Sequence, residues 1–161
     1  MIRKVKLSDA KDIVEIYNPY ILNTNITFEE EPIDEEEMKK RILEKTANNP
    51  WIVYEENNKV IGYAYLSNWM HRSAFKYSKE ISIYLDMNVL SKGIGTMLFK
   101  TLLEECMNYK IHSIVSGITI PNEKSVRLHE KFGFKNIATF YEIGYKNNEW
   151  LNVGYWQLNL K

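Results

Sequence analysis

Apolar and polar residues alternate along residues 2–6 and then recur at helical spacing further along the chain. Alternation with a period of two is typical of a half-buried strand. Ser8 stands as an N-cap before apolar residues three and four positions apart, beginning at Ile13, and Asp34 can cap a second helix that carries Met38. The pattern therefore predicts a strand followed by two helices.

Three β-prone runs follow the second predicted helix. Residues 51–54 and 60–66 are rich in aromatic and β-branched side chains, and the polar residues 55–59 between them are typical of a hairpin turn. Residues 81–85 alternate along their length. We expect these runs to form an antiparallel meander.

The second half of the chain alternates between helical and strand patterns. A helix is expected from Gly93, a strand over residues 114–120 and another helix over residues 122–131. Two β-prone segments close the chain and turn at residues 146–149. This order predicts an α+β fold, in which a mixed, mostly antiparallel sheet carries helices on both faces.

Length and charge limit the classes of protein to which the chain can belong. Its 161 residues, 45% hydrophobic and 26% charged, fit one globular domain over residues 1–161. The 21 basic and 21 acidic side chains cancel, and no run of five like charges occurs, so nucleic acid is not an expected partner. The single cysteine, Cys106, cannot form an internal disulfide and is expected to be a buried small hydrophobe.

The sequence shows no pattern typical of a membrane protein. No stretch approaches 18 consecutive apolar residues. The first six residues alternate charged and apolar side chains, whereas a signal peptide has a continuous apolar core. We expect a cytoplasmic protein that does not bind membranes.

A glycine-containing turn over residues 90–96 joins a predicted strand to a predicted helix. The first turn of a helix has backbone N–H groups without intrahelical partners, and the helix dipole and Lys92 add positive potential. Gly93 and Gly95 permit close approach, so the turn could hold a pyrophosphate, although glycines also serve ordinary tight turns. Neither the Rossmann motif, which has glycine where this chain has Leu98, nor the P-loop matches.

This turn is similar to the Gln/Arg-x-x-Gly-x-Gly/Ala signature of the GCN5-related N-acetyltransferase (GNAT) superfamily. Three longer blocks resemble its phosphinothricin and methionine sulfoximine acetyltransferase branch: residues 69–75 followed by 80–85, residues 120–134, and residues 144–157. The resemblance spans almost the whole chain. It implies the GNAT fold and transfer of an acetyl group from acetyl-CoA, without a metal, to the α-amino group of a small amino acid or analogue.

Three positions depart from the patterns of these families. Leu90 stands where Gln or Arg is usual, Phe75 where Tyr is usual, and Asn152 where Asp is usual. A main-chain phosphate cradle depends on turn geometry more than on one side chain, so we expect the Leu90 departure to weaken cofactor contacts without abolishing function. The other two departures bear on which substrate is accepted.

Two residues are candidates for catalysis. An alkyl amine has a pKa of about 10 and must lose a proton before it can attack a thioester. Glu80, at the start of an alternating strand, is placed to accept that proton, although it could also be a solvated charge beside Lys79. The resemblance places His129 where other superfamily members carry a tyrosine proposed to protonate the departing thiolate. The imidazole could shuttle the substrate proton or protonate coenzyme A, or it could be a packing residue of the helix.

Three residues are candidates for substrate binding. Arg72 can pair bidentately with a carboxylate and so select α-amino acids, or it can be an exposed loop arginine. The resemblance implies that Phe28, on a loop between the first two helices, and Phe75 form an apolar wall against the substrate. Either phenylalanine could instead belong to the core.

The resemblance also assigns residues to acetyl-CoA. The backbone of residues 83–85 is expected to bind the pantetheine arm like an added strand. Asn122 can contact the cofactor, or it can cap the helix that follows. The full cofactor-binding set is Ile83, Tyr84, Leu85, Ser91, Lys92, Gly93, Ile94, Gly95, Thr96, Asn122, Ser125 and Lys131.

Aromatic side chains crowd the last block, where they suit either a sheet core or a subunit interface. Because the resembled branch is typically dimeric, a homodimer is expected. Two other functions stay open: an enzyme of the same fold that acts on a protein N-terminus or a polyamine, and a non-catalytic module that binds acyl-CoA.

Overall fold

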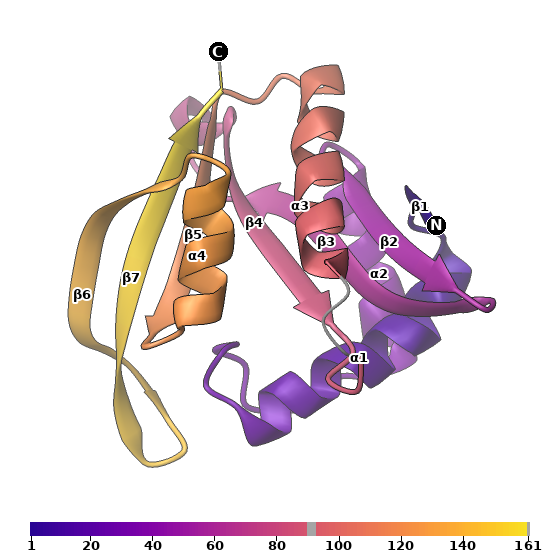
Figure 1. The fold of residues 1–161 in the computed structure, drawn as a ribbon, viewed down its shortest axis with the longest axis horizontal. Helices are drawn as coiled ribbons and strands as arrows, with labels where there is room; N and C mark the ends of the chain where they lie inside the picture. The colour runs from indigo at the N-terminus through magenta and orange to yellow at the C-terminus, as the bar shows by residue number, and fades with distance from the viewer. Residues whose placement is uncertain (90–92, 161) are drawn as a thin grey trace.

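Seven strands form one sheet in the order β1-β2-β3-β4-β5-β7-β6 (Figure 1). The computed structural model describes residues 1–89 and 93–160. All neighbouring strands are antiparallel except β4 and β5, which are parallel. The strands are β1 (Ile2–Lys4), β2 (Trp51–Glu56), β3 (Lys59–Asn68), β4 (Ser78–Leu85), β5 (Ser113–Ile120), β6 (Lys135–Lys146) and β7 (Glu149–Asn159).

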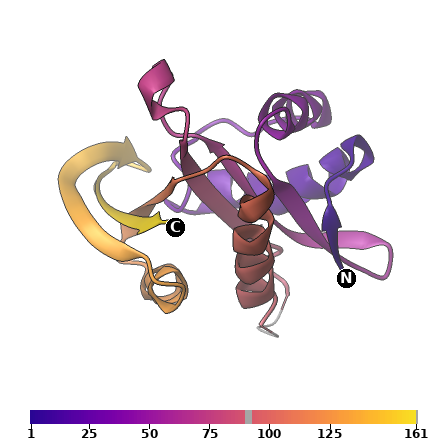
Figure 2. The same ribbon diagram turned by 90° about the horizontal axis from the view of Figure 1, so that it is seen from above.

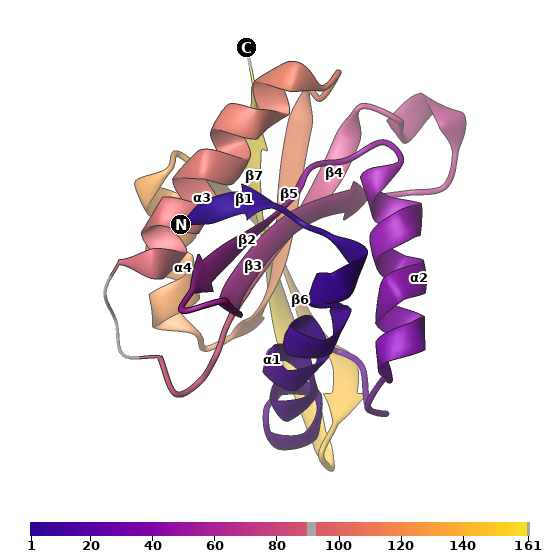
Figure 3. The ribbon, with the colours of Figure 1, turned by 90° about the vertical axis from the view of Figure 1, so that its right-hand side faces the viewer.

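Helices cover both faces of this sheet (Figures 2 and 3). One face packs against α1 and α2, and the other against α3 and α4. The helices are α1 (Ala10–Asn23), α2 (Glu35–Thr46), α3 (Ile94–Glu105) and α4 (Glu123–Lys131), with 3-10 turns at η1 (Leu7–Asp9), η2 (Ser73–Phe75) and η3 (Cys106–Asn108). The predicted α+β architecture is confirmed.

Each face has its own core. On one face the fully buried Leu98, Phe99 and Leu102 of α3 pack against the sheet. On the other face, Ile13 of α1 and Tyr63 of β3 belong to a second buried cluster. Both helices carry an apolar stripe at helical spacing, which explains why these segments fold as surface-covering helices.

The structure confirms one predicted helix cap and corrects another. Asp34 caps α2, because its Oδ1 accepts the Glu37 N–H at 2.8 Å. The prediction that Ser8 caps the first helix is wrong, since α1 begins only at Ala10, after the 3-10 turn η1. The Asp9 carboxylate instead accepts the Lys6 N–H at 2.7 Å and two bonds from the Arg3 guanidinium, which fixes the chain entering α1.

Cys106 is buried, as the sequence predicts, and its thiol contacts the Leu102 carbonyl of α3. Burial raises the pKa of this thiol to about 12. The residue is therefore a protonated packing group. Across the described segments 1–89 and 93–160, no helix is long and apolar enough to cross a bilayer.

The two parallel strands separate soon after they meet. Pairing between β4 and β5 joins Ser78 to Ser113, Lys79 to Ile114 and Glu80 to Val115, and their described pairing ends there. Beyond this point the strands diverge toward their C-terminal ends (Figure 1). This divergence positions the site described next.

Candidate active site

Two adjoining cavities occupy the opening between β4 and β5. The first, of about 450 Å³, is called the Glu80 cavity and is lined by residues 26–29 of the loop after α1, residues 80–84 of β4 and residues 116–119 of β5. The second, of about 380 Å³, is called the glycine-turn cavity and is lined by residues 93–96 at the start of α3 and by one side of α4. They share four lining residues, so they adjoin: Ile26, Ile83, Asn122 and Ser125.

The start of α3 forms one wall of the glycine-turn cavity. Gly93 has a left-handed φ of 74°, a conformation that favours glycine. The first helical bond runs from the Met97 N–H to the Gly93 carbonyl at 3.0 Å. No side chain of residues 1–89 or 93–160 caps the helix, so within this part of the chain its first-turn N–H groups are available to a ligand. The predicted contacts Ser91 and Lys92, and the departure at Leu90, lie outside the described residues.

Basic side chains from α4 form the opposite wall. Lys124, Arg127 and Lys131 all line the glycine-turn cavity. Ile94, Gly95 and Thr96 line it from the α3 side. An unpaired helix N-terminus facing three cations has the chemistry of a phosphate site. A pyrophosphate carrier therefore fits the residues that are present.

The backbone of β4 offers hydrogen-bonding groups to the opening. The Asp86 N–H donates to the Ile61 carbonyl of β3 at 2.9 Å, so strand alternation turns the N–H groups of Ile83 and Leu85 toward the β5 side. The Leu85 carbonyl already accepts a bond from the Tyr20 hydroxyl at 2.5 Å. An extended ligand in the opening can pair with Ile83 as a further strand would.

Tyr84 contributes to the site differently from its neighbours. Its backbone belongs to the set that faces β3, whereas its ring lines the Glu80 cavity. The ring packs edge-on against Tyr17 and Tyr20 of α1, with centroids 5.0 and 5.1 Å apart. The structure therefore gives Tyr84 a side-chain role in the wall, and it leaves Ile83 and Leu85 as the strand positions that face the opening.

Glu80 lies where the pairing of β4 with β5 ends, and its side chain lines the cavity named after it. Burial raises the pKa of its carboxyl group. Lys79 points to the opposite face and donates to Asn68 Oδ1 at 2.7 Å, so the two neighbours do not form an ion pair. A half-buried carboxylate that lines a cavity has the properties of a proton acceptor.

His129 is buried on α4, with 2% of its surface exposed, and it lines the Glu80 cavity. Its Nδ1 lies 2.7 Å from the Ser125 carbonyl, which can only accept, so the neutral ring carries its proton on Nδ1 and has a free lone pair on Nε2. The rings of Phe99 and Phe134 pack edge-on against it. Burial lowers the pKa of His129, which favours this neutral form.

The predicted substrate residues separate into two groups. Phe28 is half exposed and lines the Glu80 cavity. Arg72 and Phe75 lie on or beside η2, which projects from the sheet (Figure 2). Phe75 packs edge-on against Trp69, and Arg72 lines a separate cavity beside Lys110. A single chain therefore does not bring Arg72 and Phe75 to Glu80.

Asn122 and Ser125 combine the two roles that the sequence left open. Asn122 caps α4, because its Oδ1 accepts the Ser125 N–H at 3.3 Å. Both residues also line both cavities. Capping and ligand contact are therefore compatible at this helix start.

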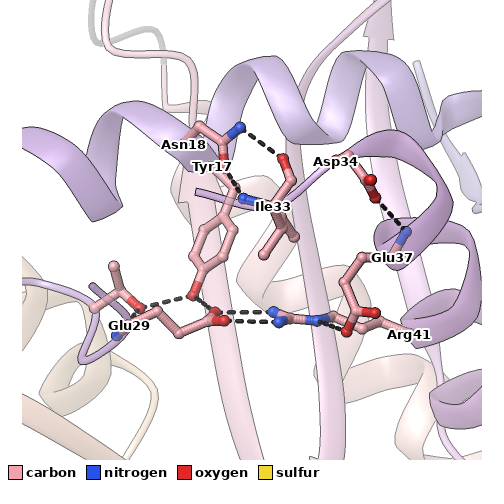
Figure 4. Close-up of polar contacts among 8 residues, drawn as sticks. Tyr17, Asn18, Glu29, Ile33, Asp34, Glu37 and Arg41 are labelled. Atoms are coloured by element: carbon pink, nitrogen blue, oxygen red, sulfur yellow. Dashed lines mark hydrogen bonds and ion pairs between the residues drawn. The ribbon is translucent and has the colours of Figure 1, made fainter. Parts of the chain in front are cut away.

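A polar network that the sequence reasoning missed forms the α2 side of the Glu80 cavity (Figure 4). Arg41 donates two bonds to the Glu29 carboxylate, at 2.8 and 2.6 Å, and its Nε donates to Glu37 at 3.1 Å. The Tyr17 hydroxyl bonds both Glu29 and Thr27. Only the i,i+4 spacing of Glu37 and Arg41 was visible in the sequence, since the other contacts join separate elements.

These contacts fix the charge of Glu29. Burial acts to raise the pKa of its carboxyl group, but hydrogen bonds from Arg41 and Tyr17 outweigh burial, so the pKa lies below its ordinary value. Lys45, one turn after Arg41, also lines the cavity. Its Nζ lies 5.9 Å from the centroid of the Tyr65 ring.

The β6–β7 hairpin holds the loop that carries Phe28. Lys146 is 3% exposed, and its Nζ donates to the Thr27 carbonyl at 2.9 Å. Asn147 Nδ2 donates to Asn25 Oδ1 at 2.8 Å. The hairpin and the loop are far apart in sequence, yet together they fix one wall of the Glu80 cavity.

The chain belongs to the GNAT acetyltransferases, because the family model described as an acetyltransferase (GNAT) domain matches residues 2–153. GNAT enzymes transfer acetyl groups. The predicted resemblance to this superfamily is confirmed.

Named relatives confirm the predicted branch as well. A phosphinothricin N-acetyltransferase of Streptomyces coelicolor is 31% identical, covering 92% of this chain and 90% of the relative. A methionine sulfoximine/methionine sulfone acetyltransferase of Salmonella typhimurium is 32% identical, covering 99% and 94%. An L-amino acid N-acyltransferase of Escherichia coli is also 32% identical, covering 99% and 93%.

Solved structures share the fold. A phosphinothricin acetyltransferase of Sinorhizobium meliloti in complex with acetyl-CoA has a TM-score of 0.94 at 33% identity, covering 99% of this chain and 88% of the other. A structure named as a ribosomal-protein-alanine N-acetyltransferase of Brucella melitensis has a TM-score of 0.96 at 30% identity, covering 99% of both chains. The GNAT fold predicted from the sequence is therefore confirmed.

Replacing Lys146 with Met should loosen the loop over residues 24–29, because the Thr27 carbonyl loses its donor. A hydrogen bond from a charged group contributes about 1.5–3 kcal/mol, so amide hydrogen exchange in this loop should accelerate roughly 10-fold or more. Mass spectrometry of peptides spanning the loop measures this rate. Lys135→Met, at an exposed position of the same strand, is the control; equal rates in wild type and Lys146→Met would contradict the assignment.

Proposed function

We propose that this enzyme transfers the acetyl group of acetyl-CoA to the α-amino group of a small amino acid or amino-acid analogue. One observation carries the proposal: the N-terminal turn of α3 and a half-buried carboxylate line two adjoining cavities that share Ile83. Relatives whose names give phosphinothricin, methionine sulfoximine or L-amino acids as the acceptor support this class of substrate.

The glycine-turn cavity suits the donor. The pyrophosphate of acetyl-CoA would bind the first-turn N–H groups of α3 and the cations of α4, among them Lys131. The pantetheine arm would pair with the backbone of Ile83 and Leu85 on the side where β4 no longer pairs with β5. This path leads the thioester toward the boundary with the Glu80 cavity, and an N–H of β4 can stabilise negative charge on the acetyl oxygen.

Glu80 serves as the general base in this mechanism. The ammonium of the acceptor passes a proton to the Glu80 carboxylate, directly or through a water, and the free amine then attacks the thioester carbon. A C–N bond forms, the C–S bond breaks, and coenzyme A leaves as a thiolate. The nitrogen loses a second proton as it becomes an amide, and the thiolate takes up this proton. No covalent intermediate on the enzyme is needed, because both substrates meet at the shared wall of the two cavities.

His129 can take part in deprotonation of the acceptor ammonium and in protonation of the coenzyme A thiolate. Its neutral ring has an acceptor at Nε2 and lines the cavity that holds Glu80. It can therefore relay the proton of the acceptor and, once protonated, deliver it to the thiolate. Contact of Arg72 and Phe75 with the acceptor stays a prediction, because a single chain places both away from Glu80.

A second candidate acceptor is a protein N-terminus, which is favoured by the likeness to the structure named for ribosomal-protein alanine. A cavity of about 450 Å³ has the size of a small-molecule site, which favours a free amino acid. A non-catalytic acyl-CoA-binding module is the third reading, and it would bind the donor without turnover.

A free-thiol assay with acetyl-CoA and a panel of acceptors tests the function directly. The panel contains phosphinothricin, methionine sulfoximine, methionine sulfone, the 20 standard amino acids, spermidine, and a peptide that begins with alanine. We expect thiol release with free amino acids or analogues and no release with spermidine. Preferred turnover of the peptide would contradict the proposal, and tight acetyl-CoA binding without release from any amine would identify a binding module.

Replacing Glu80 with Gln should lower turnover by about 10²–10⁴-fold, because the variant lacks the proton acceptor. Burial raises the pKa of Glu80, so the acid limb of the wild-type kcat/KM profile lies at higher pH than for an exposed carboxyl group, and the rate increases with pH along that limb. The variant should lose this limb and still bind acetyl-CoA by calorimetry. Unchanged turnover across pH 5–9 would remove Glu80 from the mechanism.

The stability of this variant supplies an independent check. A carboxyl group whose pKa is raised in the folded state favours folding when protonated and opposes it when ionised. Glu80→Gln removes that opposition at neutral pH, so its thermal midpoint should equal or exceed that of wild type. The exposed Glu104→Gln on α3 is the control and should match wild type in both assays.

We further propose that the enzyme is a homodimer that pairs through the face of β6 and β7. Strand β6 is an edge strand, and unpaired edges with exposed apolar side chains are typical of association surfaces. Six large side chains there are between 49% and 75% exposed: Ile137, Phe140, Tyr141, Ile143, Tyr145 and Trp150.

Tyr141→Asp should convert this dimer to a monomer, because it places a charge on the association surface at a position that is 75% exposed. Light scattering after size-exclusion chromatography should give about twice 19.1 kDa for wild type and 19.1 kDa for the variant. Met107→Asp, at a similarly exposed position on η3, should stay dimeric. A monomeric wild type would refute the proposal.

A further inference from the structure

The Glu80 cavity contains four charged side chains among the described residues: Glu29, Arg41, Lys45 and Glu80. Glu29 and Arg41 form a bidentate ion pair and so neutralise each other. One cation and one anion then remain, on different walls of the cavity. Lys45 comes from the last turn of α2, and Glu80 comes from β4.

The ammonium group of Lys45 has no ion-pair partner in the described part of the chain. Its Nζ makes no ion pair or hydrogen bond with residues 1–89 or 93–160 and lies near the face of Tyr65, which also lines the cavity. Burial, followed by repulsion from Arg41, lowers the pKa of the ammonium group. A half-buried cation without a partner costs free energy, and an anionic ligand would offset that cost.

We propose that Lys45 binds the α-carboxylate of the acceptor while Glu80 faces its amino group. The inference rests on the proposed function and deepens it, because it names the group that selects α-amino acids. A zwitterion offers one ammonium and one carboxylate, and the cavity offers one free carboxylate and one free ammonium. A bare amine or a polyamine lacks the anion and would leave Lys45 unpaired.

Lys45 replaces Arg72 as the carboxylate-binding cation in this proposal. Arg72 is the cation that the sequence favoured, yet it lines a different cavity beside Lys110. Arg41 shares the Glu80 cavity, but its guanidinium is already used by Glu29 and Glu37. Lys45 is therefore the described cation of this cavity that is available to a substrate.

The test compares two acceptors that differ only in the carboxylate: L-methionine sulfone and its α-carboxamide, or the corresponding pair for the amino acid that gives the fastest thiol release. Lys45→Met keeps the apolar length of the side chain and removes the charge. We expect KM for the free acid to rise roughly 10- to 100-fold, with kcat changed less, because a charge-assisted contact is lost. KM for the carboxamide should stay within about 2-fold, since that acceptor never used the charge.

Three variants serve as controls. Lys45→Arg should restore most of the affinity for the free acid. Lys40→Met, at an exposed position of the same helix, should behave as wild type. Arg72→Met should change KM for the free acid and KM for the carboxamide by the same factor. Thermal unfolding and acetyl-CoA calorimetry on each variant check that the fold and the donor site are intact.

Several outcomes would overturn the inference while the proposed function stands. One is an equal rise in KM for the free acid and the carboxamide in Lys45→Met. Another is a rise in KM for the free acid alone in Arg72→Met. A rise in KM of Lys45→Met for phosphinothricin, with KM for methionine sulfone unaffected, would show that Lys45 binds an acidic group of the acceptor side chain. It would contradict binding of the α-carboxylate. Wild-type enzyme that releases thiol with no amine would overturn the proposed function as well.

Discussion

The early end of pairing between β4 and β5 is the constraint on which the site depends. After Glu80 the two parallel strands diverge, and the backbone groups of Ile83 lose the strand partner that they would have in a continuous sheet. Unpaired backbone groups inside a protein cost free energy unless water or a ligand satisfies them. The opening is therefore both the passage that joins the two cavities and a surface prepared for an extended ligand.

Strand alternation divides the chemistry between the two faces of the sheet. Glu80 and Tyr84 project toward α1 and α2, where the Glu80 cavity lies, whereas Ile83 and Leu85 project toward α3 and contribute to its core. Because the strand is one rigid element, the proton acceptor and the donor-binding backbone keep a fixed relation. The polar α2 network and the Lys146 contact then hold the loop that closes the cavity from the side.

The elements of the fold were predictable because their signals are local. Alternating apolar positions predicted the meander, helical spacing predicted the stripes of α1 and α3, and Asp34 supplied a cap that the structure confirms. Ser8 is an equally good cap by residue type. The chain instead forms a 3-10 turn there, because Asp9 is bonded to Arg3 on β1. That competing contact joins a helix start to a strand, so no local pattern showed it.

By itself the sequence determined the fold class, the glycine turn and the candidacy of Glu80, because each depends on residue type at short spacing or on family resemblance. Only the tertiary structure decided which charges share a cavity. It brought Lys45 of α2 into the cavity of Glu80, paired Arg41 with Glu29, and placed Arg72 elsewhere. The physical reason is that ion pairing and burial are set by distances between elements, and those distances depend on how the helices pack on the sheet rather than on spacing along the chain.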